Sequence, residues 1–340
     1  MTPHEEPSAA PFSLPPALSR LPVPGATLAD GHLEPGRIIG DVIVDGLVGR
    51  GGMSEVYRVR HRIHQRVLAL KILDPRVYRS AGHRYQHMLF ARLRREGRLQ
   101  LAIRHPNIVR VEAIVETDDG PALIMELVEG PSLDTLLKRR EVLDWDDVDD
   151  IAQGLMSALA RAQRAGVVHR DIKPGNVLLT RRDGRWVPKL IDFGLAKHPG
   201  DGDELTVTGQ VMGTPGYMPL SQMTDAKHVD GTVDTYALGA VLYELTTGRR
   251  LVPSSKRVSP DVVGRALHDL SQTDVPGRMQ QAITAAVHAT RASRSAGDVL
   301  AFWKGTAPGS SEPAWRSWGL LFVLSTFAAS WLALGILALG

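Results

Sequence analysis

The sequence predicts an α+β fold in which a strand-rich part precedes a helical part, and one apolar helix ends the chain. Short β-branched runs separated by glycine-containing turns recur over residues 38–127 and predict strands. From residue 132 onward the pattern becomes helical. Residues 319–340 contain no charged side chain, which predicts a C-terminal transmembrane helix.

Composition excludes several classes of protein. The chain has 340 residues, of which 43% are hydrophobic and 23% are charged, as in an ordinary globular protein. Its formal net charge of +3 is too small to indicate a nucleic-acid partner, so none is expected. Cysteine is absent, which excludes disulfides, thiolate metal sites and cysteine nucleophiles.

Residues 1–36 are expected to form a disordered, proline-rich leader. A segment of this composition cannot bury enough apolar surface to offset the cost of ordering its backbone. A proline-rich docking peptide is the alternative. Folded structure is expected to begin near Arg37.

A glycine-rich stretch follows the first predicted strand. Residues 38–48 are mostly β-branched and predict one strand. Residues 49–56 then read Gly-Arg-Gly-Gly-Met-Ser-Glu-Val, ahead of a second strand over 57–60. Glycines allow backbone amides to approach phosphate oxygens, because no Cβ stands in the way. Taken alone, the stretch is equally consistent with a plain hairpin turn.

Lys71 lies in the middle of an apolar strand predicted over residues 67–73. An unpaired ammonium is costly to bury, so this lysine needs an anionic partner. Residues 85–103 predict a helix in which Glu96 is the only acid. The surrounding arginines indicate either a solvated face or a site for a phosphorylated loop or an anionic lipid.

The remaining elements alternate in type along the chain. Residues 109–115 and 121–127 predict two further strands, and residues 132–139 and 144–166 predict helices. Acidic residues at the start of the second helix suit its positive end. The helical part is therefore expected to begin just after the second of these strands.

The densest group of chemical side chains lies in residues 169–194. Residues 169–176 read His-Arg-Asp-Ile-Lys-Pro-Gly-Asn, and residues 192–194 read Asp-Phe-Gly. Two strands joined by a turn over 182–185 would bring Asp171 and Asp192 together. Carboxylate and amide oxygens in this arrangement could hold Mg²⁺, which prefers oxygen ligands.

Glycine-rich loop, lysine, helix glutamate, H-R-D-x-x-x-x-N and D-F-G occur in the order and spacing of protein kinases. Over residues 37–304 the chain resembles bacterial transmembrane serine/threonine kinases of the eukaryotic-like, Hanks-type family. The resemblance implies a bilobal protein-kinase fold, with an N-lobe over 37–127 and a C-lobe over 131–304. It also implies ATP and Mg²⁺ as cofactors and protein serine or threonine hydroxyls as acceptors. A linker over 305–318 would then lead to the transmembrane helix.

The same resemblance assigns catalytic roles. Asp171 would orient the attacking hydroxyl and accept its proton, and Lys173 would steady the γ-phosphate. Lys71 would bind the α- and β-phosphates and pair with Glu96. Asp234 would brace the backbone of the catalytic loop, and His169 would be a packing residue.

Metal and nucleotide contacts follow in the same way. Asn176 and Asp192 would hold Mg²⁺, Met125 would be the gatekeeper behind the adenine, and Glu126 to Val128 would form the hinge. The residues expected around the nucleotide are Gly49, Arg50, Gly51, Gly52, Met53, Ser54, Val56, Ala69, Lys71, Met125, Glu126, Val128, Asn176 and Asp192.

Regulation would depend on the loop that follows Asp-Phe-Gly. Thr206 and Thr208 are candidate autophosphorylation sites, because a phosphate there could order the loop beside Arg170. Ser221 stands where the family carries a glutamate, so Arg294 would lack its usual partner. The substrate platform is therefore expected to be looser than is usual.

Two alternatives remain open. Ser54, where a third glycine is usual, and Ser221 support a membrane-tethered pseudokinase scaffold that binds nucleotide or a partner with little turnover. A small-molecule phosphotransferase is the other alternative, and Arg170 and Lys173 oppose it. The favoured kinase would be a single-pass protein of the inner or plasma membrane with a cytoplasmic catalytic domain. It would have protein substrates, phosphothreonine-reading partners and a transient homodimer for autophosphorylation.

Overall fold

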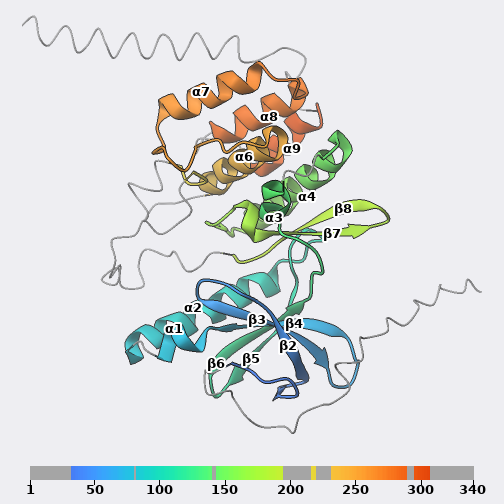
Figure 1. Ribbon diagram of the computed structural model, residues 1–340, viewed down its shortest axis with the longest axis vertical. Coiled ribbons are helices and arrows are strands. Elements are labelled where there is room, and N and C mark those ends of the chain that lie inside the picture. Colours follow the sequence, from blue (N-terminus) through green and yellow to red (C-terminus); the bar gives the residue numbers. More distant parts are fainter. Residues whose placement is uncertain are drawn as a thin grey trace, which may run out of the picture.

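The computed structural model describes residues 32–79, 82–139, 143–193, 216–219, 231–288 and 295–306. These residues form a strand-rich lobe and a helical lobe, which lie one above the other in Figure 1. The described part of the chain contains no helix long and apolar enough to cross a membrane. Several predictions lie outside the described residues, namely those for most of the leader, Thr206, Thr208, Ser221, Arg294 and the segment 319–340.

The N-terminal lobe is built on a six-stranded antiparallel sheet with the order β1-β2-β3-β4-β6-β5. Its strands are β1 (Ile38–Ile39), β2 (Val42–Arg50), β3 (Ser54–His61), β4 (Val67–Leu73), β5 (Val111–Thr117) and β6 (Gly120–Glu126). The single strand predicted over 38–48 is wrong. Gly40 has a φ of 54°, so the chain turns there and β1 pairs back onto β2.

The glycine-rich stretch is the tip of a hairpin. β2 and β3 extend further into it than predicted, and Arg50 pairs with Glu55 at its base. The Gly51 amide donates to the Ser54 carbonyl at 2.7 Å and closes the turn. The Asp74 amide also donates to the Met53 carbonyl at 2.9 Å, which ties the tip to the end of β4.

Two helices complete this lobe, α1 (Pro75–Arg79) and α2 (His83–Ala102). α2 packs against β5 and β6 through a cluster that includes Leu89, Leu93 and Leu123. A Cβ placed on Gly97 would lie 2.5 Å from Leu123 Cδ2 and 3.0 Å from Ile114 Cδ1, closer than packed atoms come. The helix therefore packs tightly against the sheet at the residue next to Glu96.

The C-terminal lobe consists mainly of helices: α3 (Leu133–Lys138), α4 (Trp145–Arg164), α6 (Thr232–Thr247), α7 (Pro260–Ser271), α8 (Gly277–Val287) and α9 (Ala296–Trp303). The helices predicted over 132–139 and 144–166 are confirmed as α3 and α4. Ser132 and Asp144 cap them by accepting from the amides of Thr135 and Asp147. α6 is buried along most of its length, which fixes the position of Asp234 in its first turn.

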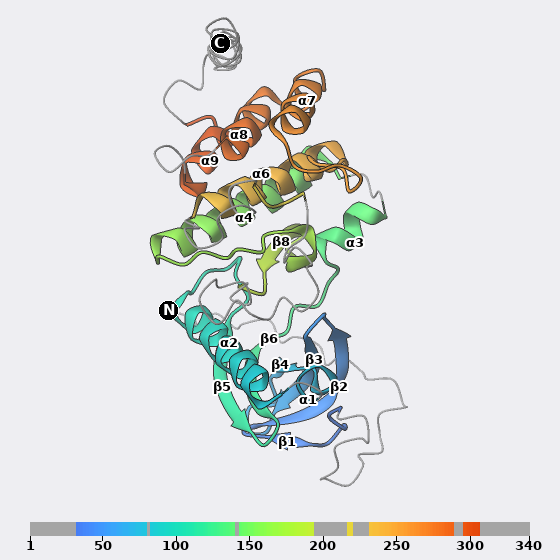
Figure 2. The same cartoon turned by 90° about the vertical axis from the view of Figure 1, so that its left-hand side faces the viewer.

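A second, two-stranded sheet lies on the helical lobe and faces the strand-rich lobe (Figure 2). It is the predicted hairpin, β7 (Val177–Arg182) and β8 (Arg185–Leu190), and it packs on α4. Val109 and Asn107 of the first lobe exchange backbone hydrogen bonds with Leu190 at 3.0 and 2.9 Å. Residue 192 and the loop over 169–176 therefore lie at one end of this hairpin, beside the junction of the lobes.

Candidate active site

Lys71 links three elements of the structure. Its Nζ lies 2.6 Å from Glu96 Oε1 on α2 and 2.7 Å from Asp192 Oδ1 after β8. Burial opposes the charge on Lys71, but Asp192 and Glu96 outweigh that effect and raise its pKa. The predicted Lys71–Glu96 pair is present, whereas the direct contact with Asp192 was not predicted.

The two carboxylates respond differently to this ammonium. Burial raises the pKa of Glu96, because desolvation outweighs the attraction of Lys71. Partial burial also opposes ionisation of Asp192, yet the charge and hydrogen bond of Lys71 hold its pKa below the usual range. Asp192 therefore carries its negative charge at the point where the lobes meet.

Asp171 is the centre of a second cluster. Its Oδ2 accepts from Lys173 Nζ at 2.8 Å and from Asn176 Nδ2 at 2.9 Å. Asn176 Nδ2 also donates to the Asp171 carbonyl at 2.8 Å, across the short 3₁₀ helix Pro174–Asn176. The structure thus brings together the three catalytic-loop residues that the sequence singled out.

A buried carboxylate gives this loop its shape. Asp234 Oδ2 accepts from the His169 amide at 2.6 Å, and its Oδ1 accepts from the Arg170 amide at 2.7 Å. These bonds hold Arg170 at a φ of 65°, which is uncommon for a residue with a side chain. Burial raises the pKa of Asp234 to about 6. The bracing role predicted for Asp234 is confirmed.

His169 joins the catalytic loop to the segment before Asp192. The residue is fully buried, and its Nε2 lies 2.9 Å from the Ile191 carbonyl oxygen. Its ring packs against Phe193, with 4.6 Å between ring centroids. This surrounding agrees with the packing role predicted for His169.

Strand register places several predicted nucleotide contacts on one face of the sheet. Val56 is directly opposite Lys71, and Ala69 is directly opposite Met125. Cross-strand partners point to the same face, and residues two apart on a strand do so as well. Val56, Ala69, Lys71 and Met125 therefore share the face that carries the Lys71 ammonium.

The hinge segment has a contact that the sequence did not reveal. Lys189 Nζ on β8 lies 2.5 Å from Glu126 Oε1 at the end of β6. Both side chains are largely buried, and the pair joins the strand-rich lobe to the hairpin before Asp192. The sequence shows only that Glu126 and Lys189 have opposite charges, and it contains no pattern that indicates their pairing.

The glycine-rich hairpin leaves room around its backbone. A Cβ on Gly49 or Gly52 would meet no atom within 4 Å, so neither glycine is required by packing. The Arg50 side chain is directed to Glu55, which lies on the opposite face of β3 from Val56. Only the backbone of Arg50 is thus placed to serve the predicted phosphate contact.

The oxygen donors fit the predicted Mg²⁺ site. The side-chain nitrogen of Asn176 donates to Asp171, so the side-chain oxygen of Asn176 can serve as a metal ligand. The Asp192 carboxylate is partly exposed and ionised. Within the described ranges no three His, Asp or Glu side chains form a metal cluster. Mg²⁺ commonly binds through one or two protein oxygens together with substrate phosphates and water, so these two donors suit it.

Comparisons with known proteins agree with this geometry. The family model "Protein kinase domain" matches residues 43–296. Serine/threonine-protein kinase pkn3 of Myxococcus xanthus is 36% identical over 238 residues, which cover 68% of this chain and 41% of that protein. Serine/threonine-protein kinase PknH of Mycobacterium tuberculosis is 35% identical over 213 residues, covering 63% of this chain and 32% of PknH.

The chain therefore spans less than half of the length of these two relatives. A similar solved structure is the crystal structure of the Mycobacterium tuberculosis PknI kinase domain. It has a TM-score of 0.60 and 26% identity, and the match covers 81% of this chain and 100% of that chain.

Proposed function

This chain belongs to the protein kinase family, with a domain of the serine/threonine class, and we propose that it transfers the γ-phosphate of ATP to serine and threonine hydroxyls of proteins. The observation that carries the proposal is the meeting of two charged clusters. Lys71, Glu96 and Asp192 form one, and Asp171 with its lysine and asparagine partners forms the other. His169 and Asp234 hold the second cluster in place beside the first.

Each cluster supplies one requirement of phosphoryl transfer, which depends on positioning and on charge stabilisation rather than on covalent catalysis. Lys71 is a buried ammonium with a raised pKa, suited to binding phosphate oxygens next to Asp192. Asp171 offers a carboxylate to the hydroxyl that attacks, and Lys173 places a positive charge beside it. The bond from Asn176 fixes the orientation of the Asp171 carboxylate.

Asn176 and Asp192 are the residues that would hold Mg²⁺. When bound, the metal would neutralise charge on the β- and γ-phosphates. Because Lys71 Nζ donates to Asp192 Oδ1, the ammonium and a metal held by Asp192 would share the same carboxylate.

The test is incubation of the full chain with labelled ATP, Mg²⁺ and a generic basic protein, beside an Asp171→Asn variant. Labelling of the basic protein on serine and threonine by the wild type alone supports the proposal. Retained ATP binding without protein labelling would instead favour the pseudokinase scaffold. Labelling of small hydroxylated metabolites in place of protein would favour the small-molecule phosphotransferase.

The proposal includes membrane anchoring and autophosphorylation. The uncharged segment 319–340 would span about 33 Å as a helix, which matches a hydrocarbon core of about 30 Å. A kinase held in this way by the inner or plasma membrane meets its neighbours at raised effective concentration. Transient homodimers would then phosphorylate Thr206 or Thr208 and create sites for phosphothreonine-reading partners.

Membrane fractionation and phosphosite mapping test this part separately. The full chain should sediment with membranes, and a variant lacking residues 306–340 should not. The deletion should also lower autophosphorylation at cellular protein density. Recovery of the full chain in the soluble fraction would contradict the anchor and leave the catalytic proposal intact.

A further inference from the structure

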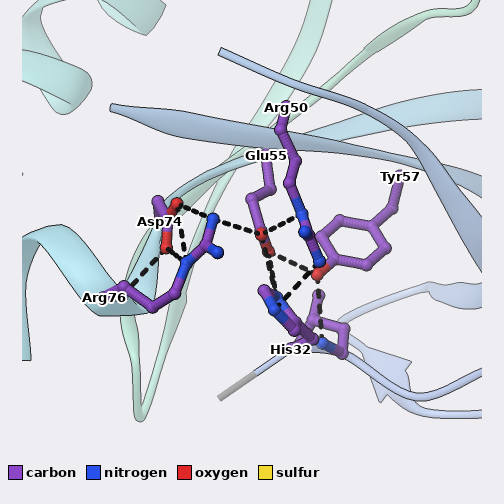
Figure 3. A network of polar contacts seen from close by, with 7 residues as sticks. His32, Arg50, Glu55, Tyr57, Asp74 and Arg76 are labelled. Atoms are coloured by element: carbon purple, nitrogen blue, oxygen red, sulfur yellow. Dashed lines mark hydrogen bonds and ion pairs between the residues drawn. The ribbon is translucent and has the colours of Figure 1, made fainter. Parts of the chain in front are cut away.

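A buried carboxylate lies directly behind the glycine-rich hairpin. Glu55 follows Ser54 on β3 and has no exposed surface. Its carboxylate gathers side chains that are far apart in sequence, as Figure 3 shows. Oε2 accepts from the Tyr57 hydroxyl at 2.6 Å, and Oε1 lies 3.1 Å from Arg50 Nε. The hairpin thus has a polar anchor on the face opposite Val56.

His32 completes this anchor from a position before the matched domain. Its Nδ1 lies 2.8 Å from Glu55 Oε1 and 3.0 Å from Oε2, and its Nε2 lies 2.9 Å from Arg50 Nη2. The next residue, Leu33, is buried in the lobe's core, and its amide donates to the Tyr57 hydroxyl at 3.1 Å. The family model begins at residue 43, so both residues are additional to the matched domain.

The contacts define the protonation state of His32. A guanidinium can only donate hydrogen bonds, so Nε2 must accept from Arg50. The hydrogen on Nδ1 is then the one donated to the Glu55 carboxylate. In this arrangement the imidazole is neutral. A proton added to Nε2 would leave two donors facing each other across 2.9 Å.

The charges of the cluster lead to the same conclusion. Glu55 and Arg50 balance each other, and so do Asp74 and Arg76, whose closest atoms lie 2.7 Å apart. Arg76 Nη2 also lies 4.0 Å from Glu55 Oε1. Tyr57 contributes no charge, because burial and the hydrogen bond to Glu55 raise its pKa. With a neutral His32 the cluster therefore has no net charge.

Protonation of His32 would add a positive charge that nothing in the cluster balances. The imidazolium would compete with Arg50 for Glu55, and it would also repel the guanidinium. The Arg50 side chain is 44% exposed, so it can leave for solvent, whereas Glu55 cannot. Arg50 is the last residue of β2, directly before the glycine turn, so its release frees one arm of the hairpin.

We propose that His32 is a positioning residue for the glycine-rich hairpin: its neutral imidazole holds Arg50 against Glu55, and protonation releases Arg50 and weakens nucleotide binding. The inference rests on the proposed nucleotide-binding function. It adds a pH-sensitive contact that originates outside the matched domain.

The experiment measures the dissociation constant of a non-hydrolysable ATP analogue with Mg²⁺ for the full chain at pH 8 and pH 6. Two variants bracket the wild type. His32→Gln keeps a donor and an acceptor but cannot gain a proton, and His32→Lys carries a fixed charge. The protonation of the nucleotide changes with pH in the same way for every protein tested. At each pH, the dissociation constant of each protein is therefore divided by that of His32→Gln.

The dissociation constant of the wild type divided by that of His32→Gln should be near one at pH 8. At pH 6 the same ratio should be about two to ten, the range that one net hydrogen bond provides. His32→Lys should bind more weakly than His32→Gln at both values. His268→Gln, which changes an exposed histidine of α7, should follow the wild type. A ratio that does not change with pH would overturn the inference.

Arg50→Gln is a further variant, which tests the inference without any substitution at His32. Arg50→Gln removes the repelled group and leaves His32 in place, so its pH dependence should match that of His32→Gln. If the dissociation constant of Arg50→Gln still changes with pH as that of the wild type does, the inference would also be overturned. A wild type that binds no nucleotide at either pH would instead refute the proposed function, and this inference with it.

Discussion

Lys71 and Glu96 lie 25 residues apart in sequence, yet their charged atoms meet at 2.6 Å between β4 and α2. The contact forms only while α2 is docked on the sheet, so it reports the position of the helix. Lys71 has Asp192 as its second partner, which means that loss of Glu96 shifts the ammonium rather than leaving it unpaired.

Glu96→Gln should therefore impair catalysis more than folding. The amide keeps the shape of the side chain but removes the charge that holds Lys71 toward α2. We expect kcat/KM to fall by about ten- to a hundredfold, on the order of 1.4–3 kcal/mol. Glu116→Gln is the matched control, because it breaks an exposed pair with Arg94 on the same helix. Equal losses in the two variants would contradict this role.

Asp171→Asn should abolish turnover and retain nucleotide binding. The amide cannot accept the hydroxyl proton, and general-base catalysis typically contributes about 10²–10⁴-fold. Phosphorylation of a basic protein and binding of an ATP analogue measure the two effects. Asp183→Asn, in the turn between β7 and β8, is the control, since asparagine tolerates the φ of 51° found there. Full activity of Asp171→Asn would remove Asp171 from the mechanism.

Asp234 should make stability depend on pH in an unusual direction. Burial raises its pKa from 3.8 to about 6, so between these values the folded chain binds more protons than the unfolded chain. The stabilising contribution of this carboxyl is fully present below about pH 4 and is lost as pH rises through about 6. Its total size is on the order of 3 kcal/mol.

Urea unfolding of the wild type and Asp234→Asn at pH 4 and pH 7 measures this contribution. The stability of the wild type relative to the variant should fall between the two values. The variant should also lose activity at every pH, because the His169 and Arg170 amides donate to different oxygens of Asp234, and asparagine would present an NH2 group to one of them. A constant difference in stability across the range would contradict the assignment.

The Glu126–Lys189 pair should stabilise the hinge by roughly 1 kcal/mol of coupling energy. A double-mutant cycle with Glu126→Gln and Lys189→Met isolates that energy. Each single variant should raise KM for ATP with little change in kcat, because the pair holds the segment that would contact the adenine. Strictly additive effects of the two changes would show that the residues are not coupled.

The sequence was most informative where local chemistry is demanding. Asp171, Asn176 and Asp192 lie in short motifs whose spacing predicts their meeting, and the structure brings Asp192 to Lys71 and the other two together. Strand and helix positions were right to within a few residues because apolar patterns repeat along each element. The break at Gly40 was missed, since a glycine in a β-branched run is compatible with a continuous strand.

Long-range polar contacts could not be predicted in the same way. A glutamate is rarely buried without a partner, so the charge of Glu55 suggests an exposed position, yet this residue is fully buried. Its burial depends on His32 and Arg50, which reach it from two other segments. Such partners are selected by tertiary packing, so a single sequence offers no pattern that identifies them.

Because α2 lies close to the sheet at Gly97, even a methyl side chain at this position would change the packing between them. A methyl group there would act as a wedge between α2 and the sheet, against Leu123 and Ile114. Gly97→Ala should therefore displace the ends of these two side chains and loosen the contact surface of the helix that carries Glu96, although every catalytic atom remains in the chain.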